Sequence, residues 1–193
     1  MRKIIWTISV SVDGYMEGPN REIDWHMVDD EYFRHQIDWL AGAGAFLEGR
    51  VTYELMAGFW PAADQDPAAT PMVIEFAQIW RETPKVVYSR TLERAEWNAT
   101  VVHDVVPAEV LALKAQPGGD LVLGGSDLAA EFARHDLIDE YRLYVHPMLI
   151  GRGTPMLRPS DAKVPLRLVE THNFGNGVIM LRYERRLLES AGG

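Results

Sequence analysis

The stretch DLVLGGSDLAAEF, residues 120–132, decides the fold class of this chain. Its apolar residues 121–123 are typical of a buried parallel strand, and the apolar residues that follow recur at helical spacing. Gly124 and Gly125 therefore fall at a turn from strand to helix. Such a turn directs backbone N–H groups and the positive end of a helix dipole at one point, which suits an anion such as phosphate. A tight turn that only needs positive φ at a glycine is the alternative reading.

Strand and helix patterns alternate along the rest of the sequence, which predicts an α/β fold with a mostly parallel central sheet flanked by helices. The expected strands are residues 3–12, 45–47, 85–88, 100–103, 121–123, 140–146, 166–172 and 178–185. The expected helices are residues 29–41, 52–57, 71–81, 107–115 and 127–134. The last two strands are separated only by the turn sequence NFGNG, so we expect a C-terminal antiparallel hairpin.

Length and composition narrow the class of protein. The chain has 193 residues, of which 47% are hydrophobic and 24% charged, so we expect one well-cored domain over residues 1–187 and a frayed tail over residues 188–193. It contains no cysteine and has neither a signal peptide nor an apolar run of membrane-spanning length, so we expect a cytoplasmic protein. Its formal net charge of -9 opposes binding to nucleic acid.

Two further strand ends carry residues that suit a phosphate. Gly49 and Arg50 follow one expected strand and precede a helix that begins near Thr52, and Ser89 and Arg90 follow another. Ligands of open α/β sheets bind at the carboxyl ends of the strands, where guanidinium and hydroxyl groups match phosphate oxygens. Solvated arginines paired with nearby acids are the alternative. The pattern G-x-G-x-x-G is missing at Gly124, so the usual dinucleotide fingerprint is not present.

With these motifs in view, the chain resembles the dihydrofolate reductase fold family. It is closest to the reductase domain at the C-terminus of bacterial riboflavin-biosynthesis deaminase-reductases. The resemblance rests on SVSVDGYMEGP, GRVTYE, VVYSRTL, VLGGSDLAAEF and YVHPMLIGRGTPML, which occur in family order over nearly the whole chain. It implies NADPH as cofactor. The contacts that it implies for NADPH are Ser9, Gly49, Arg50, Thr52, Ser89, Arg90, Gly124, Gly125 and Ser126.

Two carboxylates are candidates for the proton step of a reductase. Asp13 stands where the riboflavin branch keeps an acid beside the nicotinamide, and Asp30 lies five residues after Trp25, as does the acid of bacterial folate reductases. Either side chain could supply or orient a proton, which needs a carboxyl group with a raised pKa. The alternatives are an Asp-Gly turn at Asp13 and a helix cap at Asp30.

The resemblance implies an NADPH-dependent reductase of riboflavin biosynthesis, acting on a small heteroaromatic or ribosylamino-pyrimidine substrate such as 5-amino-6-(5-phosphoribosylamino)uracil. A dihydrofolate or pterin reductase is an alternative, although two folate contacts have no counterpart. The folate-gripping arginine is absent from residues 53–66, and Leu128-Ala129 replace a tyrosine that follows Gly-Gly. The further alternatives are a non-catalytic nucleotide-binding dimer and a metal-assisted hydrolase.

The histidines are expected to have structural roles, and several aromatic residues could either bind a ligand or pack in a core. No spacing of the histidines matches a metal motif, so we expect no metal site and place His146 near the pocket. The histidines are His26, His35, His103, His135, His146 and His172. Four aromatic residues could stack on a flat heterocycle or pack in a core: Trp6, Trp25, Phe59 and Trp60.

The C-terminal strands predict a homodimer. Segments such as YRLYVHPMLI and GVIMLRY carry apolar residues on both expected faces, although a hairpin at a sheet edge should be solvated on one side. A second copy of the chain would cover that surface, and the resemblance also implies pairing. A helix of the same chain is the alternative cover.

Overall fold

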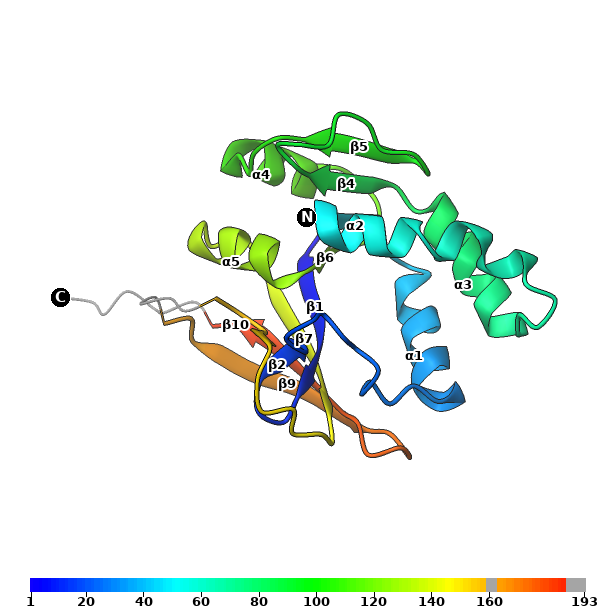
Figure 1. The fold of residues 1–193 in the computed structure, drawn as a ribbon. Coiled ribbons are helices and arrows are strands. Elements are labelled where there is room, and N and C mark those ends of the chain that lie inside the picture. The colour runs from blue at the N-terminus through cyan, green and yellow to red at the C-terminus, as the bar shows by residue number, and fades with distance from the viewer. Residues whose placement is uncertain (159–162, 187–193) are drawn as a thin grey trace.

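The computed structural model describes residues 1–158 and 163–186, so the expected tail at residues 188–193 lies outside the described residues. Within these ranges eight strands form one sheet in the order β5-β4-β3-β6-β1-β7-β10-β9 (Figure 1). The strands are β1 (Ile4–Ser11), β3 (Ala45–Gly49), β4 (Lys85–Tyr88), β5 (Ala99–Val102), β6 (Leu121–Gly124), β7 (Glu140–His146), β9 (Leu166–Asn173) and β10 (Ile179–Arg185). In this order, neighbouring strands from β5 through β7 are parallel, and β10 is antiparallel to both of its neighbours. This arrangement confirms the predicted sheet and hairpin.

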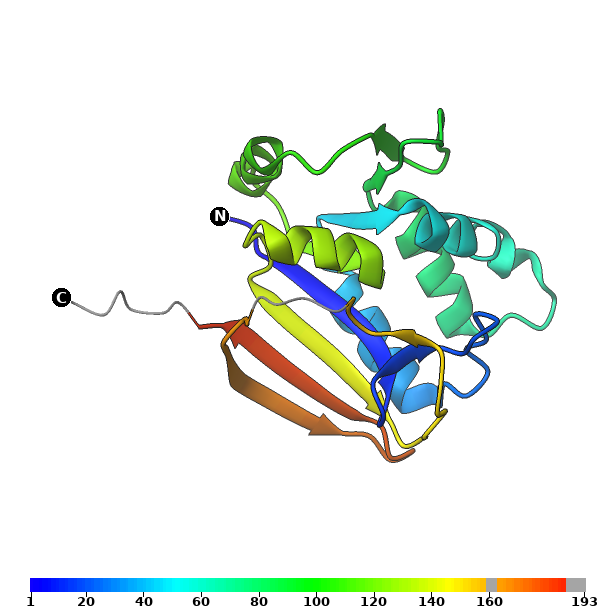
Figure 2. The same cartoon turned by 60° about the vertical axis from the view of Figure 1, so that its left-hand side comes forward.

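Helices cover both faces of the sheet (Figure 2). The cluster on one face includes residues of α4 and α5, and the cluster on the other face includes residues of α1, α2 and α3. These helices are α1 (Asp30–Leu40), α2 (Arg50–Ala57), α3 (Pro71–Glu82), α4 (Pro107–Ala115) and α5 (Ser126–Arg134). No helix of the described residues is both long and apolar enough to cross a membrane.

Three short elements were not expected from the sequence. The 3₁₀ helix η1 (Trp60–Gln65) packs against α3, and β2 (Tyr15–Glu17) pairs with β8 (Thr154–Pro155) in a separate two-stranded sheet. The β2–β8 pair joins segments that are far apart in the chain. Local sequence patterns carry no information about such pairing, which explains why it was missed.

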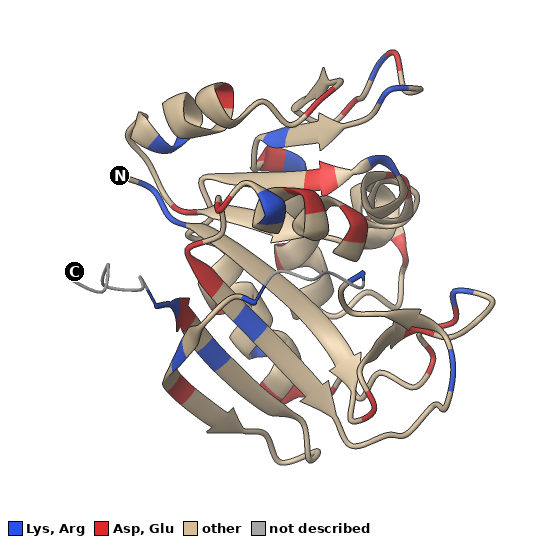
Figure 3. Cartoon of the chain, turned by 90° about the vertical axis from the view of Figure 1, so that its left-hand side faces the viewer, with Lys and Arg blue, Asp and Glu red and all other residues tan. Residues whose placement is uncertain are grey.

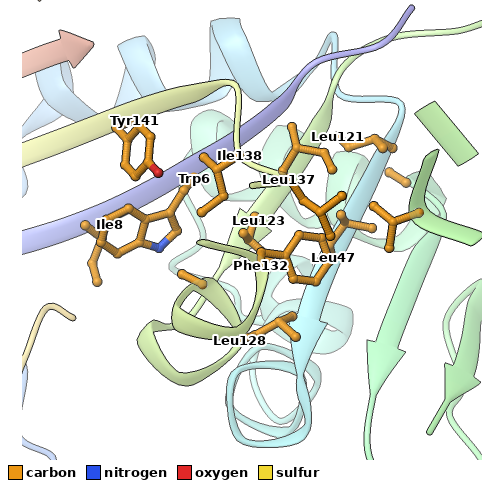
Figure 4. Packing of buried hydrophobic residues seen from close by; sticks show 14 residues of the cluster. Trp6, Ile8, Leu47, Leu121, Leu123, Leu128, Phe132, Leu137, Ile138 and Tyr141 are labelled. Atoms are coloured by element: carbon orange, nitrogen blue, oxygen red, sulfur yellow. The ribbon is translucent and has the colours of Figure 1, made fainter. Parts of the chain in front are cut away.

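The packing of α5 on the sheet holds the Gly-Gly turn in place. Phe132 of α5 and Leu123 of β6 are fully buried, and Trp6 of β1 is 1% exposed in the same cluster (Figure 4). Burying each such side chain stabilises the fold by about 1.5–3 kcal/mol. Because the strand before the turn and the helix after it pack in the same core, they fix the position of the backbone at Gly124 and Gly125.

The outer strands β7, β10 and β9 differ on their two faces. One face is apolar, because the register sets Leu181 opposite Leu143 and Ile179 opposite Val145. The other face carries ion pairs over its outer part, and Figure 3 shows acidic and basic residues gathered on these strands. The pairs are Arg142–Glu140, Arg182–Glu140, Arg182–Glu170 and Arg167–Glu184. The expectation of apolar residues on both faces is therefore wrong for the outer part of these strands.

Candidate cofactor-binding site

A cavity of about 440 Å³ opens at the carboxyl ends of β4, β3 and β6. These strands are neighbours in the sheet and parallel to one another, so the segments that follow them meet at one edge. The cavity lining includes eight of the nine residues that the sequence assigned to a cofactor. They are Gly49, Arg50, Thr52, Ser89, Arg90, Gly124, Gly125 and Ser126.

Two helix N-termini contribute to the cavity wall. Gly49 precedes α2 and Gly125 precedes α5, and neither glycine has a side chain to accept a hydrogen bond from the first helical turn. The backbone N–H groups at both ends are therefore available to an anion. Gly125 has a φ of 85°, and a Cβ added there would lie 2.8 Å from Thr52 Oγ1. The positive φ that the alternative interpretation of the Gly-Gly turn requires is confirmed at Gly125, and the Thr52 side chain lies where a Cβ would be.

Arg50 and Arg90 of the lining are each paired with an acid. Arg50 Nη1 donates to Glu54 Oε2 at 2.7 Å, and Arg90 Nη2 donates to Asp104 Oδ1 at 2.5 Å. Both guanidinium groups are well exposed, so these pairs are weak and can exchange for a phosphate. Ser89 is buried, and its Oγ accepts the N–H groups of the two residues after Arg90 and lies 3.5 Å from Thr91 Oγ1.

Ser9 and Asp30 lie outside the cavity lining. Ser9 Oγ is 3.2 Å from Tyr32 Oη of α1, so the structure places this predicted cofactor contact between the sheet and α1. Asp30 is exposed as the first residue of α1. The start of α1 lies near the carboxyl end of β7, because the Met27 N–H donates to His146 Nδ1 at 3.0 Å.

Asp13 accepts three hydrogen bonds that link it to Ser11 and to residues 150–151. Its Oδ1 accepts from Ser11 Oγ at 2.7 Å and its Oδ2 accepts from the Gly151 N–H at 2.7 Å, with a further bond from Ile150 N–H. The hydrogen bond from Ser11 is the main cause that lowers the pKa of Asp13 below its usual value, and the backbone bonds add to it. The expectation of a raised pKa at Asp13 is therefore wrong.

Histidine and tryptophan residues take mainly structural positions. His146 is fully buried and outside the cavity lining, against our expectation, and burial lowers its pKa to about 4. Its ring is stacked 4.9 Å from that of His26. Trp6 is in the core, whereas Phe59 is 58% exposed. Within the described ranges no three histidine or acidic side chains gather as a metal site would require.

The sequence interpretation missed Asp104 and Glu48. Asp104 lines the cavity two residues after β5, a position equivalent to that of Arg90 after β4, and this parallel spacing was the available signal. Glu48 immediately precedes Gly49 and is buried, which raises its pKa to about 7. The nearby Lys85 ammonium donates to three backbone carbonyl oxygens, so it is already satisfied by other partners.

The sequence and the fold of this chain are similar to those of known proteins. The sequence profile described as the RibD C-terminal domain matches residues 2–180. The chain is 33% identical over 187 residues to the uncharacterized protein YyaP of Bacillus subtilis, covering 94% of each. It is similar to a putative riboflavin biosynthesis protein from Shewanella sp. PV-4, with a TM-score of 0.74, 19% identity and coverage of 96% and 99%.

A folate enzyme shares the same architecture. The dihydrofolate reductase of Enterococcus faecalis complexed with NADP(H) matches with a TM-score of 0.62 and 16% identity over 95% of this chain and 96% of that one. Together with the sheet order, these likenesses confirm the dihydrofolate reductase-like fold.

Proposed function

Because the chain belongs to the RibD C-terminal domain family, we propose that it is an NADPH-dependent reductase of a small heteroaromatic or ribosylamino-pyrimidine substrate. The family supports an oxidoreductase of the riboflavin-pathway type. One observation carries the choice of cofactor. Two glycine-preceded helix N-termini and two exposed arginines converge on a single cavity at the carboxyl edge of a parallel sheet.

Each part of the cavity has a task in this proposal. The N–H groups that follow Gly49 and Gly125 bind the diphosphate, and Arg50 and Arg90 neutralise phosphate charge. The positive φ of Gly125 and its contact with Thr52 leave no room for a side chain at this turn. When bound, the nicotinamide would supply a hydride. The chain would orient the nicotinamide and substrate rings and supply or orient one proton.

We assign the proton step to Asp30. The three hydrogen bonds to Asp13 favour its ionised form, and two of them join it to residues 150–151, which makes it a poor proton donor. Asp30 is exposed at the start of α1, at the sheet edge where β7 ends. Asp13 is then a positioning residue for the 150–151 segment.

Cofactor titration and a substrate screen test the proposed function. We expect NADPH to bind in calorimetry, and we expect a pterin or pyrimidine compound to accelerate the loss of NADPH absorbance. Binding without oxidation by any such compound would favour a non-catalytic nucleotide-binding protein. Absence of NADPH binding would contradict the proposal.

We also propose a homodimer formed through the apolar face of the outer strands. Ile179 of β10 is 40% exposed there, and Leu168 of β9 is 50% exposed. Two-fold pairing would bury such a stripe against its own copy. We expect light scattering after size exclusion to give twice the chain mass of 21.8 kDa.

The variant Ile179→Asp is expected to shift that mass to the monomer, because it would bury an unpaired charge in the interface. The matched control is Leu111→Asp on α4, where the side chain is 48% exposed, and this variant should remain a dimer. A monomeric unmodified protein at micromolar concentration would refute the assembly.

A further inference from the structure

The parallel register of β4 and β5 brings Arg90 and Asp104 together. Tyr88 is paired with Val102, and each of the two charged residues lies two positions beyond its strand partner. Arg90 Nε and Nη2 both donate to Asp104 Oδ1, at 2.8 and 2.5 Å. Both side chains line the cavity. A carboxylate of this chain therefore already binds the guanidinium group that a phosphate would bind.

We propose that Asp104 determines the preference between NADPH and NADH by competing with a 2′-phosphate for Arg90. The inference rests on the proposed cofactor site. A guanidinium group matches carboxylate and phosphate oxygens equally well in geometry, so the two anions compete for the Nε and Nη2 donors that Asp104 now binds. The carboxylate also repels a 2′-phosphate, whereas it can accept a hydrogen bond from the free 2′-hydroxyl of NADH.

The charges of the lining strengthen this competition. Among the described lining residues there are three arginines, which are Arg21, Arg50 and Arg90. The carboxylates of the same lining number four, and they are Glu17, Asp104, Asp127 and Glu131. A dinucleotide already brings a negatively charged diphosphate. The lining has no excess of arginines over carboxylates to neutralise an additional phosphate monoester. Removing the carboxylate nearest Arg90 should therefore favour the 2′-phosphate selectively.

Asp127 provides a matched control. It lines the same cavity at the start of α5, and its Oδ1 accepts from Arg158 Nε at 2.6 Å. Its side chain is 69% exposed, compared with 55% for Asp104. The variants Asp104→Asn and Asp127→Asn thus remove the same charge from two exposed ion pairs of the lining, and only the first releases Arg90.

The test compares two nucleotides that differ only in the 2′-phosphate. Calorimetry would measure the Kd of adenosine 2′,5′-bisphosphate and of AMP for the unmodified protein and both variants. We expect Asp104→Asn to tighten binding of the bisphosphate about tenfold and to change the Kd of AMP by less than about twofold. Asp127→Asn should change both Kd values by the same factor.

Two outcomes would overturn the inference in distinguishable ways. If Asp104→Asn alters both nucleotides equally, or neither, Asp104 does not discriminate and the cofactor site itself stays intact. If the unmodified protein binds neither nucleotide, the proposed cofactor site fails and this inference fails with it.

Discussion

Replacing Asp30 by asparagine is expected to slow hydride transfer by about 10²–10⁴-fold while the affinity for NADPH stays unchanged. Asparagine keeps the shape of the side chain and removes its ionisable proton. Asp30 is the first residue of α1, and the segment before this helix contacts His146 at the carboxyl end of β7 through the Met27 N–H. The cofactor cavity lies at the carboxyl ends of other strands of this sheet, so the variant separates the chemical step from nucleotide binding.

The measurement is single-turnover oxidation of NADPH with the substrate that the screen identifies. Asp29→Asn is the matched control, because Asp29 caps the same helix by accepting the Tyr32 N–H, and asparagine caps as well as aspartate. Asp13→Asn should affect the rate less than Asp30→Asn. Full activity of Asp30→Asn, or a larger loss in Asp13→Asn, would contradict the assignment.

Replacing Arg50 by alanine is expected to weaken NADPH binding by about 1.5–3 kcal/mol, which is the range for hydrogen bonds to charged groups. Arg50 is the first residue of α2, so its guanidinium group adds to the N–H groups of the same helix end. The ion pair with Glu54 must open before Arg50 binds phosphate, which places the expected loss toward the lower end of the range.

The control for this prediction is Arg34→Ala. Arg34 is 41% exposed, compared with 44% for Arg50, and it also pairs with an acid four residues later, but it lies outside the cavity lining. We expect Kd for NADPH to rise in Arg50→Ala and not in Arg34→Ala. Arg90→Ala should weaken NADPH more than NADH if it contacts the 2′-phosphate. An unchanged Kd in Arg50→Ala would remove the arginine from the proposed site.

The sequence by itself determined the strands of the main sheet, the five α-helices and the strand ends that build the cavity. The expected strand at residues 121–123 and the observed β6, Leu121–Gly124, differ by one residue, because a short apolar run between turn residues is a local signal. The same local signal located Arg50 and Ser89 after their strands. Parallel strands end at a common edge, so these residues could be assigned to one site before their neighbours in the sheet were known.

Contacts between distant segments were decided only by the tertiary structure. The family resemblance makes Asp13 a candidate acid, but its pKa is lowered partly by N–H groups that lie 137 and 138 residues later. Its local sequence, Asp-Gly, is compatible with either role. The electrostatic environment of a carboxyl group depends on what surrounds it in space, and sequence spacing does not supply that information.

Strand order and register also decided which residues meet in the cavity and on the outer strands of the sheet. Strand order placed Asp104 against Arg90 and so revealed an acid that motif reasoning had missed. Register placed Arg182 opposite Glu170 on one face and Leu181 opposite Leu143 on the other. Hydrophobic pattern determines that a residue is in a strand, but burial and pairing are properties of the assembled sheet, because each depends on the neighbours that the whole chain brings to it.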